Sequence, residues 1–214
     1  MSEDSFLIAP DPADPRLTER VSGVDQDGTT VETRVTVERP LTLFLNGREI
    51  VTMMTICDHP DYLAVGYLLN QNMLRPDDEV TGIDYDAEIE TVVVRTARET
   101  NYEDKLKKKT LTSGCAQGTV FGDVMIYMED VGRHNAVDKI AGYMFLNGIS
   151  GYDKIFYTTG RLTSEMVIKT VQMGMPILCS RSGFTAWGVE LARQVGLTLI
   201  GRARGKRSIA LAGA

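Results

Sequence analysis

The sequence is organised around Glu129-Asp130-Val131-Gly132-Arg133-His134-Asn135-Ala136-Val137-Asp138-Lys139, a stretch in which most side chains ionise or form hydrogen bonds. Apolar residues at helical spacing continue from it to Phe145, and Asn147-Gly148 supplies a stop signal. This spacing predicts a helix that begins near His134 or Asn135, with the polar cluster packed into the turn before it. The positive end of the helix dipole makes such a turn suited to an anion, and a solvated turn with a capping Asp or Asn is the alternative.

Length and composition indicate a globular protein. The 214 residues suffice for one large domain or two small ones, and 43% hydrophobic with 24% charged residues is ordinary for a soluble chain. No apolar run approaches the ~20 residues that span a bilayer. The first residues, Met1 to Arg16, are acidic and lack the basic start and apolar core of a signal peptide, so we expect a cytoplasmic protein without a membrane partner.

Charge is distributed unevenly along the chain. The net charge of -6 argues against nucleic acid as a partner of the whole chain. Residues 154–214, however, hold nine Lys or Arg against two acids, a charge of +7 that leaves -13 for the rest. This asymmetry predicts an anionic ligand at the C-terminal part.

The N-terminal part reads as a loose leader over residues 1–30 and a small α+β unit over residues 31–100. An Asn46-Gly47 pair between two apolar runs is a strong hairpin signal. The elements expected here are strands at Thr33–Glu38 (closed by Pro40), Leu41–Leu45, Ile50–Thr55 and Ile89–Arg95, with a helix that begins near Asp58 and Pro60.

The C-terminal part, residues 101–214, alternates strands and helices. We expect strands at Lys154–Thr159, Ile177–Ser180 and Leu197–Gly201, with helices at Thr163–Met173 and Thr185–Val195. Short connections between such elements predict a parallel α/β sheet, and ligands of these sheets sit at the carboxyl ends of the strands.

Each of these three strand ends carries arginine and small polar residues, which are suited to bind phosphate or pyrophosphate. Separate surface arginines are the alternative. The three ends read Thr158-Thr159-Gly160-Arg161, Ser180-Arg181-Ser182-Gly183, and Gly201-Arg202-Ala203-Arg204-Gly205-Lys206-Arg207.

Three cysteines and two histidines limit the metal and redox chemistry. Cys57, Cys115 and Cys179 form no CxxC pair, which argues against a disulfide framework and a zinc site, and two histidines make a dedicated metal site unexpected. Cys57 and Cys179 belong to apolar strands and are expected in the core. Cys115 lies among the small residues of Thr112–Thr119 and is the one thiol expected to be reactive.

The motifs together resemble the FdhD/NarQ family, the formate dehydrogenase accessory sulfurtransferases. The resemblance covers about residues 30–214. It is carried by Arg39-Pro40-Leu41 to Arg48, Leu63-Ala64-Val65-Gly66-Tyr67-Leu68, Ser113-Gly114-Cys115, the stretch Glu129 to Ala136, and Leu197-Thr198-Leu199-Ile200-Gly201 with its basic tail.

The resemblance implies a sulfurtransferase that takes sulfur from a cysteine desulfurase as a persulfide on Cys115. The sulfur is then passed to the molybdenum or tungsten bis-pterin guanine dinucleotide cofactor of formate dehydrogenase. The resemblance also implies a cytidine-deaminase-like fold for the second domain and a homodimer. The zinc ligands of deaminases are absent, so deaminase activity is not expected. The cofactor-binding residues it implies are Arg202, Ala203, Arg204, Gly205, Lys206 and Arg207, to which the strand ends add Arg161, Arg181 and Ser182, and the central stretch adds His134.

Two roles inside the central stretch are open at the level of sequence. Asp130 and Arg133 are expected to form an ion pair that fixes the turn. His134 then faces the ligand or assists proton movement at Cys115, with a structural histidine as the alternative.

The chain departs from the family pattern at two places. Many members carry two loop cysteines, and here Ala116-Gln117-Gly118 follows Cys115. The family also has a segment between Met125 and Ile126 that this sequence lacks. We interpret this as residues that are missing at this point, with the numbering closed over the gap. A true deletion in an inactive homologue is the alternative. The second functional hypothesis is a chaperone that binds the cofactor without transferring sulfur. The third is a thiol redox sensor, which leaves the arginines unexplained.

Overall fold

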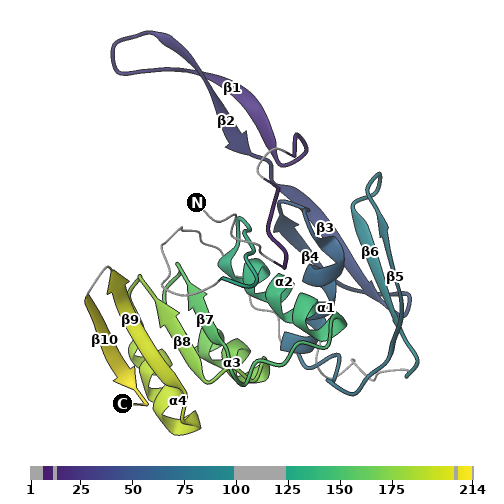
Figure 1. The fold of residues 1–214 in the computed structure, drawn as a ribbon. Coiled ribbons are helices and arrows are strands. Elements are labelled where there is room, and N and C mark those ends of the chain that lie inside the picture. Colours follow the sequence, from purple (N-terminus) through teal and green to yellow (C-terminus); the bar gives the residue numbers. More distant parts are fainter. Residues whose placement is uncertain (1–6, 12–13, 99–123, 205–206, 214) are drawn as a thin grey trace.

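The computed structural model of the chain describes residues 7–11, 14–98, 124–204 and 207–213. These residues form two units that meet at a pair of helices, and a separate β-hairpin projects from them (Figure 1). The mixed α/β class predicted from sequence is confirmed. The cytidine-deaminase-like layering stays a prediction, as do the domain boundaries.

The N-terminal unit is a four-stranded sheet with one helix packed on it. The sheet order is β4-β3-β6-β5, in which β3 and β6 are parallel and the other neighbours antiparallel. The predicted hairpin is confirmed, because Asn46 and Gly47 both have positive φ, as a tight two-residue turn requires. The elements are β3 (Arg39–Leu45), β4 (Arg48–Thr55), α1 (Pro60–Asn70), β5 (Val80–Asp86) and β6 (Thr91–Thr96).

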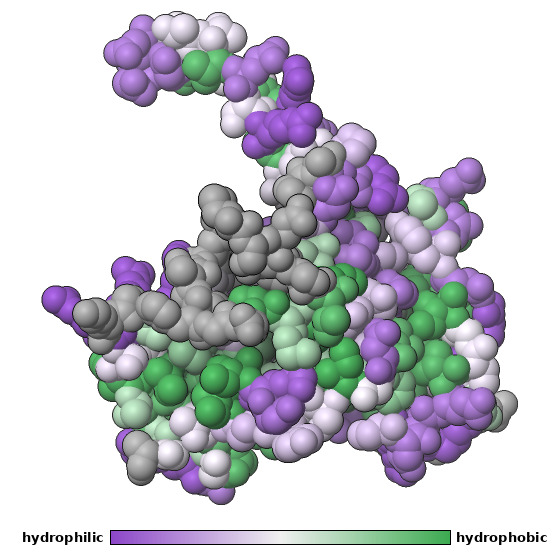
Figure 2. All heavy atoms as spheres, viewed as in Figure 1, coloured by the Kyte–Doolittle hydropathy of each residue, from purple (hydrophilic) through white to green (hydrophobic). Residues whose placement is uncertain are grey.

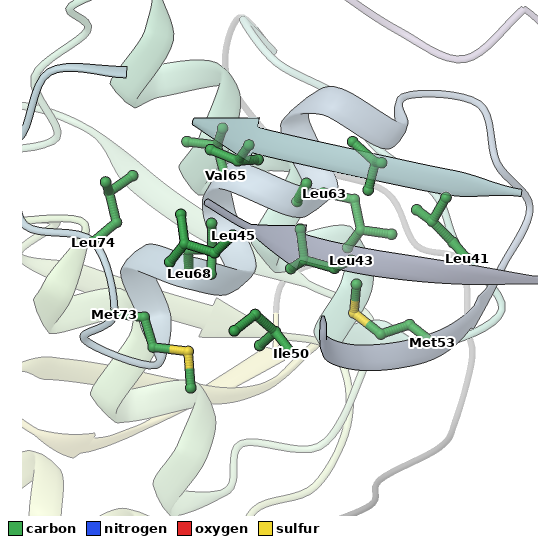
Figure 3. Packing of buried hydrophobic residues seen from close by; sticks show 13 residues of the cluster. Leu41, Leu43, Leu45, Ile50, Met53, Leu63, Val65, Leu68, Met73 and Leu74 are labelled. Carbon is green, nitrogen blue, oxygen red and sulfur yellow. The ribbon is translucent and has the colours of Figure 1, made fainter. Parts of the chain in front are cut away.

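Strict alternation in β3 creates the core of this unit. Leu41, Leu43 and Leu45 are fully buried because every second side chain of a strand points to the same face of the sheet. They pack against Leu63 and Leu68 of α1, as Figure 3 shows. Pro40, which was expected to close a strand, is instead the second residue of β3 and is paired with Met54 of β4.

The segment expected to be a loose leader contains regular structure. β1 (Thr18–Val24) pairs with β2 (Thr30–Thr36) in an antiparallel two-stranded arm. Figure 1 shows the arm extending away from both units, and Figure 2 shows that most of its surface is hydrophilic. β2 therefore replaces the strand that was expected at Thr33–Glu38.

The C-terminal unit contains the predicted parallel sheet. β7, β8 and β9 are parallel neighbours, which confirms the prediction, and β10 adds an antiparallel edge strand that the sequence did not suggest. The elements are α2 (Arg133–Leu146), β7 (Ile155–Thr158), α3 (Ser164–Gln172), β8 (Ile177–Ser180), α4 (Ala186–Val195), β9 (Thr198–Arg204) and β10 (Arg207–Ala212).

The core of the C-terminal unit lies on the helix-covered face of its sheet. Phe156, Leu178 and Leu199 occupy one row across the strands and are buried against α3 and α4. Met144 of α2 belongs to the same cluster, so α2 takes part in this core. Across the described residues, no helix is both long and apolar enough to span a membrane.

Two glycines allow α1 and α2 to touch backbone to backbone. A Cβ atom on Gly66 would lie 1.6 Å from the carbonyl oxygen of Asp138, and one on Gly142 would lie 1.9 Å from that of Tyr62. Only glycine fits at either position, because no side chain can move a helix backbone aside at low cost. The contact between the two units is therefore set by the two glycines.

Gly66→Ala is expected to lower the free energy of unfolding by about 3 kcal/mol or more, because the added methyl forces the two helices apart. Urea unfolding measures this loss. Gly23→Ala in β1 is the control, since no atom lies within 4 Å of its Cβ position. A Gly66→Ala protein as stable as the control would contradict the close helix contact.

Candidate functional site

A buried ion cluster lies where the two units meet. The Lys139 ammonium on α2 is fully buried and binds a carboxylate oxygen of Asp58, from the turn before α1. Its Nζ atom also lies 2.8 Å from Asp130 Oδ2 and donates to the carbonyl oxygen of Glu129 at 3.0 Å. Because the side chains of all three charged residues are at most 4% exposed, removing any one of them leaves a buried charge without its partner.

Asp130 is the centre of the turn that precedes α2. Its Oδ2 accepts a hydrogen bond from Thr55 Oγ1 at 2.5 Å, and its Oδ1 accepts from the backbone amide of Gly132 at 3.3 Å. Asn135 completes the turn by donating to Asp130 Oδ1 and to the carbonyl oxygen of Met54. The expected ion pair between Asp130 and Arg133 is wrong, because Asp130 pairs with Lys139 instead.

A second buried cluster is centred on Asp138, the residue of α2 directly before Lys139. Asp138 Oδ1 accepts from Asn70 of α1 and from Lys169 of α3, each at 2.6 Å. Burial raises the pKa of the Asp138 carboxyl, and the Lys169 ammonium opposes that rise. Asp138 therefore joins α2 to α1 through the hydrogen bond from Asn70, and to α3 through the ion pair with Lys169.

His134 lies beside this second cluster and not in an open cleft. Its Nε2 atom lies 3.2 Å from Glu165 Oε2, and the side chain is 9% exposed. Burial, together with the cationic Lys169 and Arg133, lowers the pKa of His134 to about 4 in spite of the neighbouring Glu165. The imidazole is therefore neutral at pH 7, which fits the structural reading of this residue.

Hydrogen bonds join the loops that follow β7 and β8 to each other and to β9. Ser180 Oγ donates to the carbonyl oxygen of Gly160 at 2.7 Å, and Leu162 N donates to that of Gly183 at 2.9 Å. Arg202 N, in the second half of β9, donates to the carbonyl oxygen of Ser182 at 3.0 Å. The carboxyl ends of the three parallel strands thus form one continuous edge, which we call the arginine rim; its described arginines are Arg161, Arg181, Arg202, Arg204 and Arg207.

The five arginines of the rim form no ion pair with a carboxylate of the described residues. Arg202 adopts a left-handed backbone with φ 54° and places its guanidinium over the ring of Phe184, 5.5 Å from the centroid. Arg202, Arg204 and Arg207 line an open depression of about 580 Å³.

Arg133 lies beside the rim, and the sequence did not assign it to the site. It is the first residue of α2, and its aliphatic part packs on Gly160, where a Cβ atom would lie 2.6 Å from Arg133 Cδ. Burial lowers the pKa of Arg133, and the nearby charge of Arg161 lowers it further, against the attraction of Glu165. The sequence feature that corresponds to this contact is Gly160, whose missing side chain leaves space for the stem of Arg133.

The predicted site residues therefore separate into three groups. Arg161, Arg181 and Ser182 lie on the rim with Arg202, Ala203, Arg204 and Arg207. His134 lies beside the second ion cluster, next to Glu165. Cys115, Gly205 and Lys206 lie outside the described residues.

The two described cysteines are poor nucleophiles. Burial raises the pKa of Cys57 to about 11, and burial also raises the pKa of Cys179. A thiol whose pKa is raised holds little thiolate at neutral pH, and thiolate is the reactive form. Among the described residues, no group of three or more His, Cys, Asp or Glu side chains is arranged to hold a metal ion.

Comparison with known proteins assigns the chain to a family. The model of the FdhD/NarQ family matches residues 36–125 and 119–213, so this protein belongs to that family. Protein FdhD of Methanocaldococcus jannaschii is 30% identical over 88% of this chain and 92% of its own length. The sulfur carrier protein FdhD of Wolinella succinogenes is 27% identical over 79% of this chain and 77% of its own.

A solved structure has the same fold. The crystal structure of a protein described as a formate dehydrogenase accessory protein, from Desulfotalea psychrophila, superposes with a TM-score of 0.72. It is 26% identical and covers 91% of this chain and 96% of its own.

The family match divides at the place where the sequence lacks a segment. Its two parts meet at residues 119–125, next to the junction of Met125 and Ile126. Residues on both sides of the junction pair with the same N-terminal segment, since Met125 O accepts from Leu7 N and Tyr127 N donates to Ile8 O in one parallel bridge. The alignment with the Wolinella protein spans 221 positions but only 79% of this chain, so that relative has residues without a counterpart here.

Lys139→Met is expected to lower the free energy of unfolding by about 3–5 kcal/mol, because two buried carboxylates lose their counter-ion. Chemical denaturation at pH 7 measures the loss. In Lys154→Met, which removes a surface pair with the 54% exposed Asp153, the loss should stay below about 1 kcal/mol. Equal losses in the two variants would contradict the structural role of the cluster.

The free energy of unfolding should decrease as the pH is lowered, because His134 takes up a proton more readily in the unfolded chain. Its folded pKa of about 4 lies below the ordinary 6.5, so the unfolded chain binds the proton more readily and stability is lost as pH falls from 6.5 towards 4. Relative to His134→Gln, the wild type should lose about 2 kcal/mol between pH 7 and pH 5. Parallel pH profiles for the two proteins would show that His134 is not buried as a neutral group.

Proposed function

We propose that this chain is a sulfur carrier that acts as a sulfurtransferase in the maturation of formate dehydrogenase. Cys115 accepts sulfur from a cysteine desulfurase as a persulfide. The sulfur is then delivered to the molybdenum or tungsten bis-pterin guanine dinucleotide cofactor, which is the client of the reaction. Relatives named sulfur carrier protein and a similar structure described as a formate dehydrogenase accessory protein support this proposal.

The observation that carries the proposal is the arginine rim. Five arginines without ion pairs to the described carboxylates lie at one edge of the sheet, at the carboxyl ends of three parallel strands and at the start of the antiparallel strand β10. Gathering like charges costs free energy that a bound polyanion offsets. A pterin dinucleotide carries pyrophosphate groups, and the planar fork of arginine binds phosphate oxygens in pairs.

The chemistry of the cysteines supports Cys115 as the carrier. Raised pKa values make Cys57 and Cys179 poor nucleophiles at neutral pH. That leaves Cys115, which lies among small residues that allow a bulky sulfur donor to approach.

Loading of Cys115 with sulfur requires no redox agent. The Cys115 thiolate attacks the outer sulfur of the desulfurase persulfide, a new S–S bond forms on Cys115, and the desulfurase thiolate leaves. In the delivery step the S–S bond breaks, Cys115 leaves as a thiolate, and the metal centre of the client cofactor, in its reduced state, supplies the two electrons that convert the transferred sulfur into a sulfido ligand. A cytoplasmic homodimer with a cytidine-deaminase-like second domain, which the family resemblance implies, belongs to the same proposal.

A cofactor-binding chaperone is the second candidate. It is favoured by the same rim, which binds a polyanion whether or not sulfur is transferred. The two functions differ only in their need for Cys115.

Cys115→Ala is expected to abolish sulfur loading and to leave binding of guanosine diphosphate unchanged. Intact-protein mass spectrometry after incubation with a cysteine desulfurase and cysteine measures the added sulfur, and titration calorimetry measures the nucleotide. Wild type should gain sulfur atoms, and Cys115→Ala should gain none.

Cys57→Ala and Cys179→Ala are the matched controls, and both should load sulfur as the wild type does. Sulfur retained on Cys115→Ala would contradict the role of this residue. Nucleotide binding by a wild-type protein that gains no sulfur would favour the chaperone.

A further inference from the structure

The β1–β2 arm is a two-stranded sheet that extends into solvent. Among the described strands, β1 and β2 pair only with each other, and Figure 1 shows the arm apart from both units. Its valines Val21, Val24 and Val31 are exposed. Because a two-stranded hairpin without further packing is only marginally stable in water, we expect the arm to gain a partner from outside.

The outer edge of β2 has free backbone groups. At the tip of the arm, Asp25 N donates to the carbonyl oxygen of Thr29 at 3.0 Å, and at its base Val37 N donates to that of Leu17 at 2.9 Å. Bonded and non-bonded pairs alternate along an antiparallel ladder, so every second residue of β2 bonds β1. The residues in between direct their N–H and C=O groups to the outer edge, and they are Thr30, Glu32, Arg34 and Thr36.

This edge is complementary to a second copy of itself. When two β2 strands pair antiparallel about a two-fold axis at Thr33, Glu32 of each copy lies opposite Arg34 of the other. Val31 then lies opposite Val35 of the other copy. A shift of the register by two residues in either direction would instead place Glu32 opposite Glu32, or Arg34 opposite Arg34. The charges therefore favour one register, since like charges directly opposite each other destabilise a sheet.

The charges within one arm also favour this pairing. Arg34 lies opposite Arg20 of β1, which is a pair of like charges. Glu32 reaches Arg20, with its Oε2 atom 3.9 Å from Arg20 Nη1, whereas Arg34 forms no ion pair with a carboxylate of the described residues. Glu32 of a second copy, on the other side of Arg34, would supply the missing carboxylate.

The outer edge of β1 lacks this complementarity. Self-pairing of β1 about Val21 would place Arg20 opposite Ser22, without any pair of opposite charges. Exposed edge strands are commonly protected by lysine, proline or a bulge. β2 contains no lysine or proline, and its ladder with β1 has no register shift. The edge of β2 is therefore the one suited to receive another strand.

We propose that β2 pairs antiparallel with β2 of a second copy of this chain, about a two-fold axis at Thr33. The two arms then form one four-stranded sheet in the order β1-β2-β2-β1. This interface rests on the homodimer that belongs to the proposed function, and it names the surface that joins the two copies. A contact of this symmetry closes after two copies, so it leads to a dimer and not to a filament.

Analytical ultracentrifugation of the full chain measures the dissociation constant of the dimer. Glu32→Arg and Arg34→Glu each place like charges opposite each other at both ends of the contact, and each should raise this constant about tenfold or more. Arg34→Glu also places a carboxylate opposite Arg20 of its own arm, so a weaker dimer in this variant does not arise from a weaker hairpin. The double variant Glu32→Arg/Arg34→Glu restores opposite charges and should dimerise like the wild type.

Glu88→Arg is the matched control for the change in net charge. Glu88 is exposed in the turn between β5 and β6, and this variant should dimerise as the wild type does.

Cysteine substitution tests the position of the two-fold axis. Under mild oxidation, Thr33→Cys should form a disulfide-linked dimer, because the two Cα atoms of a directly opposite pair lie within reach of a disulfide. Ser22→Cys should not, since Ser22 lies on the outermost strand of the proposed sheet. Equal cross-linking of the two variants would contradict the register.

The outcomes separate this interface from the proposed function. A dimer that persists in both Glu32→Arg and Arg34→Glu would overturn the pairing of the arms and leave a homodimer joined through another surface. A wild type that stays monomeric across the micromolar range and still loads sulfur on Cys115 would overturn the interface and leave the sulfur carrier. Absence of sulfur on a wild-type dimer that Glu32→Arg dissociates would contradict the sulfur carrier and support the interface.

Discussion

The burial of Lys139 between Asp58 and Asp130 is the interaction on which the rest of the structure depends. The three charges come from α2, from the turn before α1 and from the turn before α2, so the cluster joins both units of the chain. Isolated charges are costly in a protein interior, and this arrangement is stable only while all three are present with their hydrogen bonds. The cluster therefore favours a single register of α2 against α1, and Gly66 and Gly142 make that register sterically possible.

This constraint carries over to the candidate site. Once α2 is fixed, the stem of Arg133 is held against Gly160. The loop after β7 is bonded to the loop after β8, which is bonded to β9. A cationic edge needs such support, because unpaired guanidinium groups repel one another and would separate on flexible loops. The stability of the helix pair and the geometry of the proposed phosphate site are thus parts of the same network.

Local patterns predicted the elements whose stabilisation is local or strongly periodic. The Asn46-Gly47 turn, the apolar alternation of β3 and the parallel order of β7, β8 and β9 follow from turn chemistry and periodicity. β1, β5 and β10 were missed because each is an edge strand of its sheet with a mostly exposed burial pattern. Such strands are defined by pairing with a partner and not by an apolar pattern of their own.

The sequence by itself determined the kinds of residue, the start of the central helix, the three arginine-bearing strand ends and the family. Only the tertiary structure decided how the central stretch uses its charges. Asp130 binds Lys139 and Asp58 lies opposite, whereas sequence proximity had suggested Arg133. The reason is physical: the partner of a buried charge is selected by the dielectric environment and by the backbone contact of α1 with α2, and both exist only after residues distant in sequence have packed. Arg133 packs its stem on Gly160 instead.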